Sequence, residues 1–205
     1  MAWIYQITDG VPWANYDTTS QVINNTWEAY NYLNALGFSI QSICGIIGNM
    51  RYESYLNPGQ QELNQGGSLS YGYGLIQWTP ATNLINFVSG NWYDGNLQMD
   101  LVVREIRRDP DVTGRWIPTS DYPYYYNDFI SLTSIDTATR AYFHERERGT
   151  WATERLQYAN ESYQILTGTP PGPEPPGPEP PGPTPGSDIE VMTCLLLFDN
   201  RRVRK

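Results

Sequence analysis

Apolar residues recur at helical spacing over much of the first 168 residues of the chain. The first such stripe predicts a helix over about residues 19–36, with Gly37 ending it. Its members are Val22, Ile23, Trp27, Tyr30 and Leu33.

A second apolar stripe follows at once, and Ser39 is placed to cap its helix. The stripe consists of Ile40, Ile43, Cys44, Ile47 and Met50. The helix is expected to stop at Glu53 and Ser54, because Pro58 and Gly59 prevent its continuation.

Residues 59–79 are polar and rich in glycine, which favours a small β-hairpin or an irregular loop. Thr79 and Pro80 then look like a helix start, with the threonine as cap and the proline in the first turn. Further helices are expected over about residues 97–108, 134–148 and 151–166. The predicted fold class is therefore mainly α, with a small hairpin or loop insert.

A proline-rich segment divides the chain into a domain over residues 1–168 and a tail over residues 188–205. The segment between them, residues 169–187, reads TPPGPEPPGPEPPGPTPGS and predicts a semi-rigid spacer that spans on the order of 50 Å. The tail has one apolar run and a basic end, and is too short to bury a core of its own. We expect it to serve as a docking tail.

Composition narrows the possible partners. Lys and Arg number 13 against 22 Asp and Glu, and this acidic balance argues against a nucleic-acid ligand. No apolar run approaches the roughly 20 residues that span a bilayer, and the N-terminus does not have the pattern of a signal peptide. Two cysteines and one histidine do not make a metal site, and no cofactor is expected.

Glu53 is a candidate catalytic acid because of where its helix ends. Its neighbours on the same helix face, Ile46, Asn49 and Met50, are half apolar, and the helix terminus carries partial negative charge. Both effects disfavour an ionised carboxylate, and a protonated glutamate suits general acid catalysis of glycosidic cleavage. The alternative is a solvated glutamate at a helix end.

The second candidate stretch is YGYGLIQWTP, residues 71–80. Its glycines let the backbone approach a ligand closely, and Tyr73 and Trp78 offer aromatic rings. The amide of Gln77 both donates and accepts, which suits the N-acetyl group of an amino sugar. The alternative is a glycine-rich turn in which Gln77 is exposed and has no functional role.

Taken together, these stretches resemble a known superfamily. A Glu-Ser pair that ends a helix, followed about 20 residues later by Gly-Leu-x-Gln, is similar to goose-type lysozymes and lytic transglycosylases. The sequences ICGIIGNMRYESYLNPG and YGYGLIQWTPAT look like the lysozyme-like domain of phage tail proteins. A third stretch, ATRAYFHERERGTWATERLQYA, resembles the late helix pair of that family, and the resemblance covers about residues 20–167.

The resemblance implies a role for each matching position. Glu53 would be the general acid, and Ser54, Tyr73, Gln77 and Trp78 would contact the substrate. The substrate would be the alternating N-acetylmuramic acid and N-acetylglucosamine strand of bacterial peptidoglycan. No metal or cofactor takes part.

The sequence leaves several candidates for a second catalytic carboxylate. Glu147 is the first candidate, although the family shows aromatic-Glu-Arg-Pro where this chain has Arg-Glu-Arg-Gly, and a structural partnership with Arg140 or Arg148 is the alternative. Other candidates are Glu62, Asp94, Asp121 and Glu145. An inverting hydrolase places its two carboxyl groups about 6.5–9.5 Å apart and a retaining one about 5–5.5 Å, whereas a transglycosylase can work with one.

The resemblance also implies a location. We expect an enzyme carried in the phage virion, attached to tail or other virion proteins through residues 188–205. A free endolysin and a wall-binding tail component without turnover are the alternatives. A cysteine peptidase built on Cys44 and His144 is disfavoured, because Cys44 lies within an apolar stripe and reads as a small buried thiol.

Overall fold

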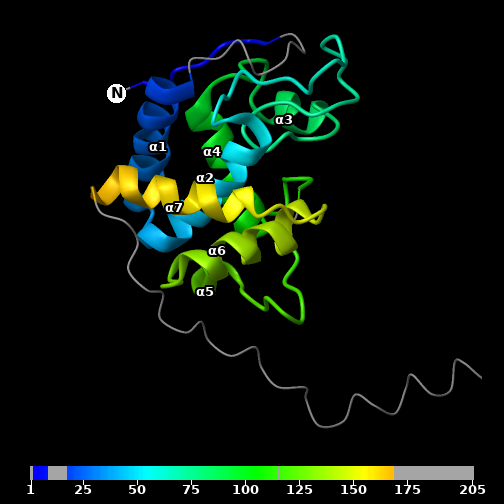
Figure 1. Ribbon diagram of the computed structural model, residues 1–205. Coiled ribbons are helices and arrows are strands. Elements are labelled where there is room, and N and C mark those ends of the chain that lie inside the picture. The colour runs from blue at the N-terminus through cyan, green and yellow to red at the C-terminus, as the bar shows by residue number, and fades with distance from the viewer. Residues whose placement is uncertain (1, 9–17, 115, 169–205) are drawn as a thin grey trace, which may run out of the picture.

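The computed structural model describes residues 2–8, 18–114 and 116–168 (Figure 1). The predicted spacer and docking tail lie outside these residues. The helices in chain order are α1 (Thr18–Ala35), α2 (Ile40–Ser54), α3 (Thr82–Phe87), α4 (Gly95–Arg107), α5 (Tyr126–Ile130), α6 (Ile135–Tyr142), the π-helix η2 (Phe143–Glu147) and α7 (Glu154–Thr167). The mainly helical class predicted from the sequence is confirmed.

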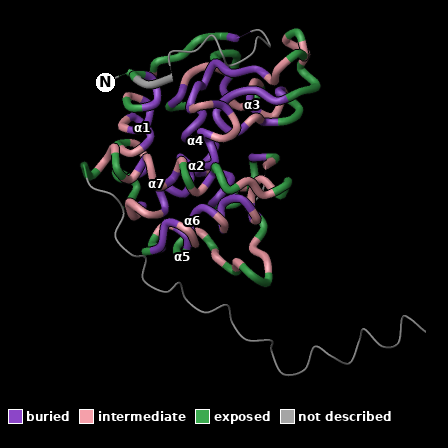
Figure 2. The backbone as a smooth tube through the Cα atoms, viewed as in Figure 1, coloured by how far each residue is buried: buried purple, intermediate pink, exposed green. Residues whose placement is uncertain are grey.

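Helix α2 is the central element of the domain. It packs most extensively against α7 and α6 and also contacts α1 (Figure 1). Figure 2 shows α2 among the buried segments at the centre, and Ile43, Ile47 and Met50 from its predicted stripe are fully buried. Burial of these apolar side chains stabilises the domain.

Both ends of α2 are fixed as the sequence predicted. The Ser39 hydroxyl oxygen accepts a hydrogen bond from the backbone amide of Ser42 at 3.1 Å, which satisfies an amide that the first turn leaves unpaired. At the other end, Tyr55 adopts a left-handed conformation, with φ of 54°, and its amide donates to the carbonyl of Arg51. The helix therefore stops directly after Glu53 and Ser54.

Two glycines let neighbouring helices approach the α2 backbone closely. A Cβ atom on Gly45 would lie 2.7 Å from the carbonyl carbon of Ala138 in α6. A Cβ atom on Gly48 would lie 2.4 Å from the carbonyl oxygen of Arg155 in α7. The two glycines thus let α6 and α7 pack closely against the backbone of α2.

Substitution of Gly48 by alanine is expected to destabilise the domain by about 1–3 kcal/mol or more, because backbone on both helices must move to admit the methyl group. Thermal unfolding measures the effect. Gly149→Ala is the matched control, since a Cβ atom there would meet nothing within 4 Å. Equal unfolding midpoints for the two variants would contradict the close approach of α7.

Other helix boundaries differ from the sequence predictions. Helix α4 starts at Gly95, two residues early, because Asp94 accepts hydrogen bonds from the amides of Asn96 and Leu97 at 2.9 and 3.1 Å. Ser134 caps α6, and the single helix predicted over about residues 134–148 changes at Phe143 into a π-helix. Helix α7 begins at Glu154, three residues later than predicted, and the short helix α5 was not predicted.

The predicted helix start at Thr79 and Pro80 is wrong. The peptide bond between them is cis, and α3 begins at Thr82. The amide of Ala81 donates instead to the carbonyl of Leu69 at 2.9 Å, so the chain here is held by the preceding loop.

Residues 59–79 form an insert that is mostly loop. Two isolated antiparallel bridges, Gln61 with Tyr73 and Tyr73 with Trp78, are its only β pairings in the part of the chain that the structure describes. The predicted hairpin is therefore not formed as regular strands, and the loop alternative describes the insert better. Among the described helices, none is both long and apolar enough to cross a membrane.

Candidate active site

A cleft of about 680 Å³ opens beside the C-terminal end of α2. Helix α2 contributes Glu53 to its lining, the insert contributes Glu62 and Gln77, and η2 contributes Glu147. Three of the residues predicted for the site, Glu53, Gln77 and Glu147, therefore meet at one cleft although they lie far apart in the sequence. Glu154, which was not predicted, lines the same cleft from the start of α7.

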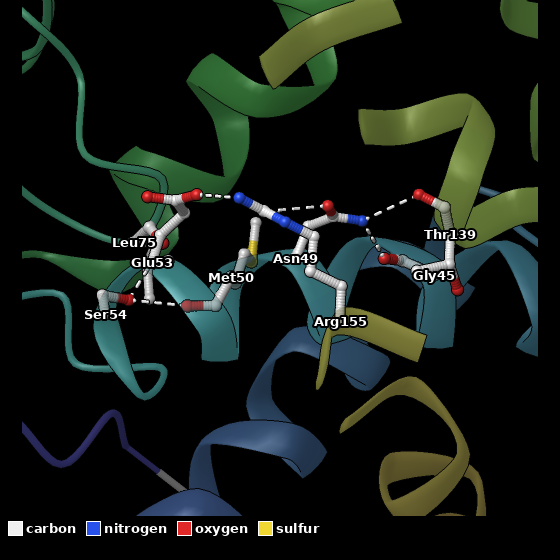
Figure 3. A network of polar contacts seen from close by, with 8 residues as sticks. All are labelled: Gly45, Asn49, Met50, Glu53, Ser54, Leu75, Thr139 and Arg155. Carbon is white, nitrogen blue, oxygen red and sulfur yellow. Dashed lines mark hydrogen bonds and ion pairs between the residues drawn. The ribbon is translucent and has the colours of Figure 1, made fainter. Parts of the chain in front are cut away.

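Glu53 is held by an arginine that the sequence analysis did not identify. The guanidinium of Arg155 lies between Asn49 and Glu53 (Figure 3), with its Nη2 atom 2.5 Å from Glu53 Oε1. Its Nη1 atom donates to Asn49 Oδ1 at 3.0 Å. Arg155 is 4% exposed and Glu53 21%, so the arginine is buried behind the carboxylate that lines the cleft.

Arg155 is itself fixed from several sides. The Asn49 side-chain amide donates to the carbonyls of Gly45 and Thr139, at 2.9 and 3.0 Å, which orients its oxygen toward the arginine (Figure 3). The ring centroids of Tyr52 and Phe143 lie 4.2 and 4.9 Å from the guanidinium carbon, within the range of cation–π contacts. A chain of fixed contacts thus runs from α6 through α2 to the carboxylate of Glu53.

The ion pair changes the electrostatics expected of Glu53. The sequence suggested apolar surroundings that would keep a proton on this residue, but the structure places a buried positive charge against it. Glu53 therefore has a charged partner in place of the apolar surroundings that the sequence suggested.

Glu147 occupies the last position of η2 and borders the same cleft. Its Oε1 atom is buried, and no donor reaches that atom among the residues that the structure describes. Burial raises the pKa of Glu147 to about 7, with the charges of Arg146 and Arg155 lowering that pKa and the charge of Glu53 raising it. A carboxyl group with a pKa near neutrality is suited to proton transfer.

The π-helical turn that carries Glu147 is supported from beneath by a second buried carboxylate. Arg146 donates from Nε and Nη2 to the two oxygens of Glu105, at 2.6 and 3.2 Å. The indole nitrogen of Trp78 donates to the same Glu105 carboxylate at 2.9 Å. Glu105 therefore ties the turn before Glu147 to the insert that carries Gln77.

Gln77 has a left-handed backbone, with φ of 52°, and lines the cleft. Its side-chain nitrogen donates to the carbonyl of Gly74 at 3.0 Å, which fixes the amide plane. A Cβ atom on Gly72 would lie 2.9 Å from the Gln77 side chain, so this turn requires a glycine. Gly72 therefore helps to position Gln77.

Three residues expected to contact substrate are buried instead. The Ser54 hydroxyl donates to the carbonyls of Met50 and Leu75, at 3.0 and 2.9 Å, and joins the end of α2 to the insert. The Tyr73 hydroxyl donates to the carbonyl of Gly67 at 2.6 Å, and Trp78 is anchored by Glu105. With 4% exposure or less, these side chains support the cleft wall and present almost no surface to a sugar.

The other candidate carboxylates have distinct positions. Glu62 lines the cleft and accepts a hydrogen bond from the amide of Gly72 at 2.9 Å. Asp94 caps α4, and Asp121 is exposed and does not line the cleft. Glu145 is fully buried, and its Oε1 atom accepts from the amide of Tyr124 at 3.3 Å.

Glu145 gives a pH dependence of stability that can be measured. Burial raises its pKa from the ordinary 4.5 to about 8, so between these values the folded state holds a proton that the unfolded state releases. Stability therefore falls as pH rises through this window. We expect Glu145→Gln to show a smaller decrease in unfolding midpoint between pH 5 and pH 9 than the parent protein.

The exposed Glu154 provides the control, because Glu154→Gln should leave the slope of unfolding midpoint against pH unchanged. An unaltered slope in Glu145→Gln would show that Glu145 does not titrate in this window.

Cys44 is fully buried within α2, and burial raises the pKa of its thiol to about 12. The sequence interpretation of a small buried thiol is confirmed. His144 stacks on the ring of Tyr122, with centroids 4.8 Å apart, in a different environment. A thiol that is neutral and inaccessible cannot act as a nucleophile.

A helical domain that presents a glutamate from the end of its central helix into a polar cleft belongs to the lysozyme-like class. Residues 24–166 match the phage tail lysozyme family, and the chain belongs to that family. It is also 30% identical over 156 residues to morphogenesis protein 1 of Bacillus phage B103. This match covers 75% of the chain and 42% of the relative, so the chain spans less than half of the relative's length.

Proposed function

We propose that the protein cleaves the glycan backbone of bacterial peptidoglycan, between N-acetylmuramic acid and N-acetylglucosamine, with Glu53 as the general acid. The observation that carries this proposal is the presence of Glu53 and Glu147 at one cleft, beside the amide of Gln77. Membership of the phage tail lysozyme family supports the same chemistry.

The cleft suits a chain of amino sugars in size and in lining. Its volume of about 680 Å³ lies in the range of small-ligand sites. Tyr52, Tyr55 and Tyr158 contribute aromatic surface to the lining, and such rings pack against the apolar faces of sugars. In the proposed complex the Gln77 amide, which lines the cleft, bonds an N-acetyl group.

Two carboxyl groups divide the proton chemistry. Burial raises the pKa of Glu147, whereas the charges of Arg146 and Arg155 lower it and so favour the ionised form that a base requires. The proposed reaction starts with the proton on Glu53 and with Glu147 ionised, so that Glu53 delivers a proton to the glycosidic oxygen and Glu147 accepts a proton from the attacking water. We therefore favour hydrolysis over transglycosylation, which would not require Glu147.

Mass spectrometry of fragments released from purified peptidoglycan tests the proposal. Reducing muramic acid ends are expected, because water is the nucleophile in hydrolysis. Anhydro-muramic ends would assign the protein to the lytic transglycosylases and remove Glu147 from its role as base. A spectrum without released fragments, from several wall types, would favour a wall-binding role and overturn the enzymatic one.

We also propose that the domain is a virion component, attached through residues 188–205 by the spacer of residues 169–187. The tail family and the phage morphogenesis relative support this location. The protein should then be detected in purified, extensively washed virions. Its recovery only from the lysate would indicate a free endolysin instead.

A further inference from the structure

A second hollow of about 730 Å³ continues the cleft on its far side. It shares four lining residues with the cleft, namely Ile76, Gln77, Thr79 and Glu147. The two hollows therefore form one groove, with Glu147 and Gln77 at its centre. We call the second hollow the arginine arm, because Arg146 and Arg148 line it.

The two parts of the groove differ in charge. Among the residues that the structure describes, the charged ones that line the cleft are carboxylates, namely Glu53, Glu62, Glu147 and Glu154. The described charged residues of the arginine arm are Arg146, Arg148 and the shared Glu147.

The two arginines have different roles in the arginine arm. Arg146 is 14% exposed and is paired with buried Glu105, so its charge is largely neutralised from below. A Cβ atom on Gly114 would lie 1.8 Å from Glu105 Oε1, which shows how tightly this carboxylate is enclosed. Arg148 is exposed, and its amide donates to the carbonyl of Phe143 at 2.8 Å, which closes the π turn and places the residue at the rim.

The other described residues that line the arginine arm are uncharged, and some of them can bond a polar substituent. Thr113 and Asn83 supply hydroxyl and amide groups, and Ile117, which is 45% exposed, supplies an apolar side. A guanidinium with neutral donors around it is suited to bind a carboxylate, because two of its N–H groups can donate hydrogen bonds to the two carboxylate oxygens in one plane. A chain of unsubstituted amino sugars would bring no anionic group to this place.

We propose that the arginine arm binds a carboxylate on the lactyl-peptide substituents of the glycan strand, with Arg148 as the residue that determines this specificity. The inference rests on the proposed function, since it assumes that the groove holds a peptidoglycan strand across Glu147. The inference goes beyond the proposed function because it assigns one end of the groove to the peptide substituents of the strand and not to its sugars. The protein is then selective for strands that carry free carboxylates.

A four-way comparison of binding tests the inference. Soluble peptide-bearing strands are used either native or with their carboxylates converted to methylamides, and each is bound to a Glu53→Gln protein with and without Arg148→Gln. Tryptophan fluorescence reports the dissociation constant. We expect amidation to weaken binding about fivefold when Arg148 is present and to have no further effect when it is replaced.

Arg108→Gln is the matched control, because Arg108 is an exposed arginine at the end of α4 that lines neither part of the groove. It should respond to amidation as the parent protein does. Independent, additive effects of amidation and of Arg148→Gln would overturn the inference, as would an equal response in Arg108→Gln.

The same measurements separate the inference from the proposed function. If the unmutated protein releases no fragments while binding still depends jointly on Arg148 and the carboxylates, the inference is retained and the enzymatic role is rejected. If the unmutated protein releases fragments but binding shows no such joint dependence, the enzymatic role is retained and the inference is rejected.

Discussion

Glu53→Gln is expected to reduce the release of soluble fragments from peptidoglycan by about 100- to 10,000-fold, the usual contribution of a general acid. Glutamine has nearly the shape of glutamate, and its oxygen can still accept the hydrogen bond from Arg155. The side chain is 21% exposed at the cleft, so the variant should remain folded. Activity is measured by fragment release and folding by thermal unfolding and circular dichroism.

The control is a second ion pair between the same two helices. Arg51 of α2 bonds to Glu161 of α7 at 2.9 Å, and neither residue lines the cleft. Glu161→Gln also removes one carboxylate from an α2–α7 ion pair, and it should keep nearly full activity. Full activity in Glu53→Gln would remove Glu53 from the mechanism.

Substitution of Arg155 is expected to affect both stability and the pH dependence of activity. Arg155→Met leaves Glu53 without its ionic partner and Asn49 without its donor, and breaking a buried pair costs about 3–5 kcal/mol. The positive charge also lowers the pKa of Glu147, so in its absence that pKa rises above about 7. The acidic limb of the activity profile should then move to higher pH, because Glu147 must be ionised to act as base.

Arg155→Lys separates charge from geometry. Lysine keeps the charge but lacks the fork that bridges Asn49 and Glu53, so kcat should fall with less movement of the pH profile than in Arg155→Met. Arg51→Lys, on the other α2–α7 ion pair, is the control and should change neither kcat nor the profile. An unchanged profile in a folded Arg155→Met protein would limit Arg155 to a structural role.

The parts of the fold predicted from the sequence are those fixed by neighbours in the chain. Ser39 caps its helix through an amide three residues away, which a sequence pattern can reveal. Thr79 and Pro80 are also residue types that favour a helix start. The amide of Ala81 instead donates a hydrogen bond to the carbonyl of Leu69, and the helix does not begin there. No pattern in residues 79–82 records that contact.

In the candidate site, too, residues in local motifs could be predicted from the sequence, whereas a residue that acts through distant contacts could not. Glu53 and Gln77 stand in recognisable motifs, and the structure places both at the cleft. Arg155 lies 102 residues after Glu53 within a helical segment, where it has the appearance of an ordinary surface arginine. Ser54, Tyr73 and Trp78 stand in the same motifs as the cleft residues, because those motifs specify the buried supports of the cleft as well as its surface.

The π-helix η2 also has a consequence for how the protein tolerates changes in length. A π turn bonds each amide to the fifth residue before it, one more than an α turn, and such turns occur mostly as single units. Loss of one residue between Phe143 and Glu147 would let this segment continue α6 as a regular helix, with successive side chains about 100° apart. The position that now presents Glu147 to the cleft would then be taken by a different side chain. Substitutions in this segment change one contact at a time, whereas a one-residue deletion redirects the whole face of the turn.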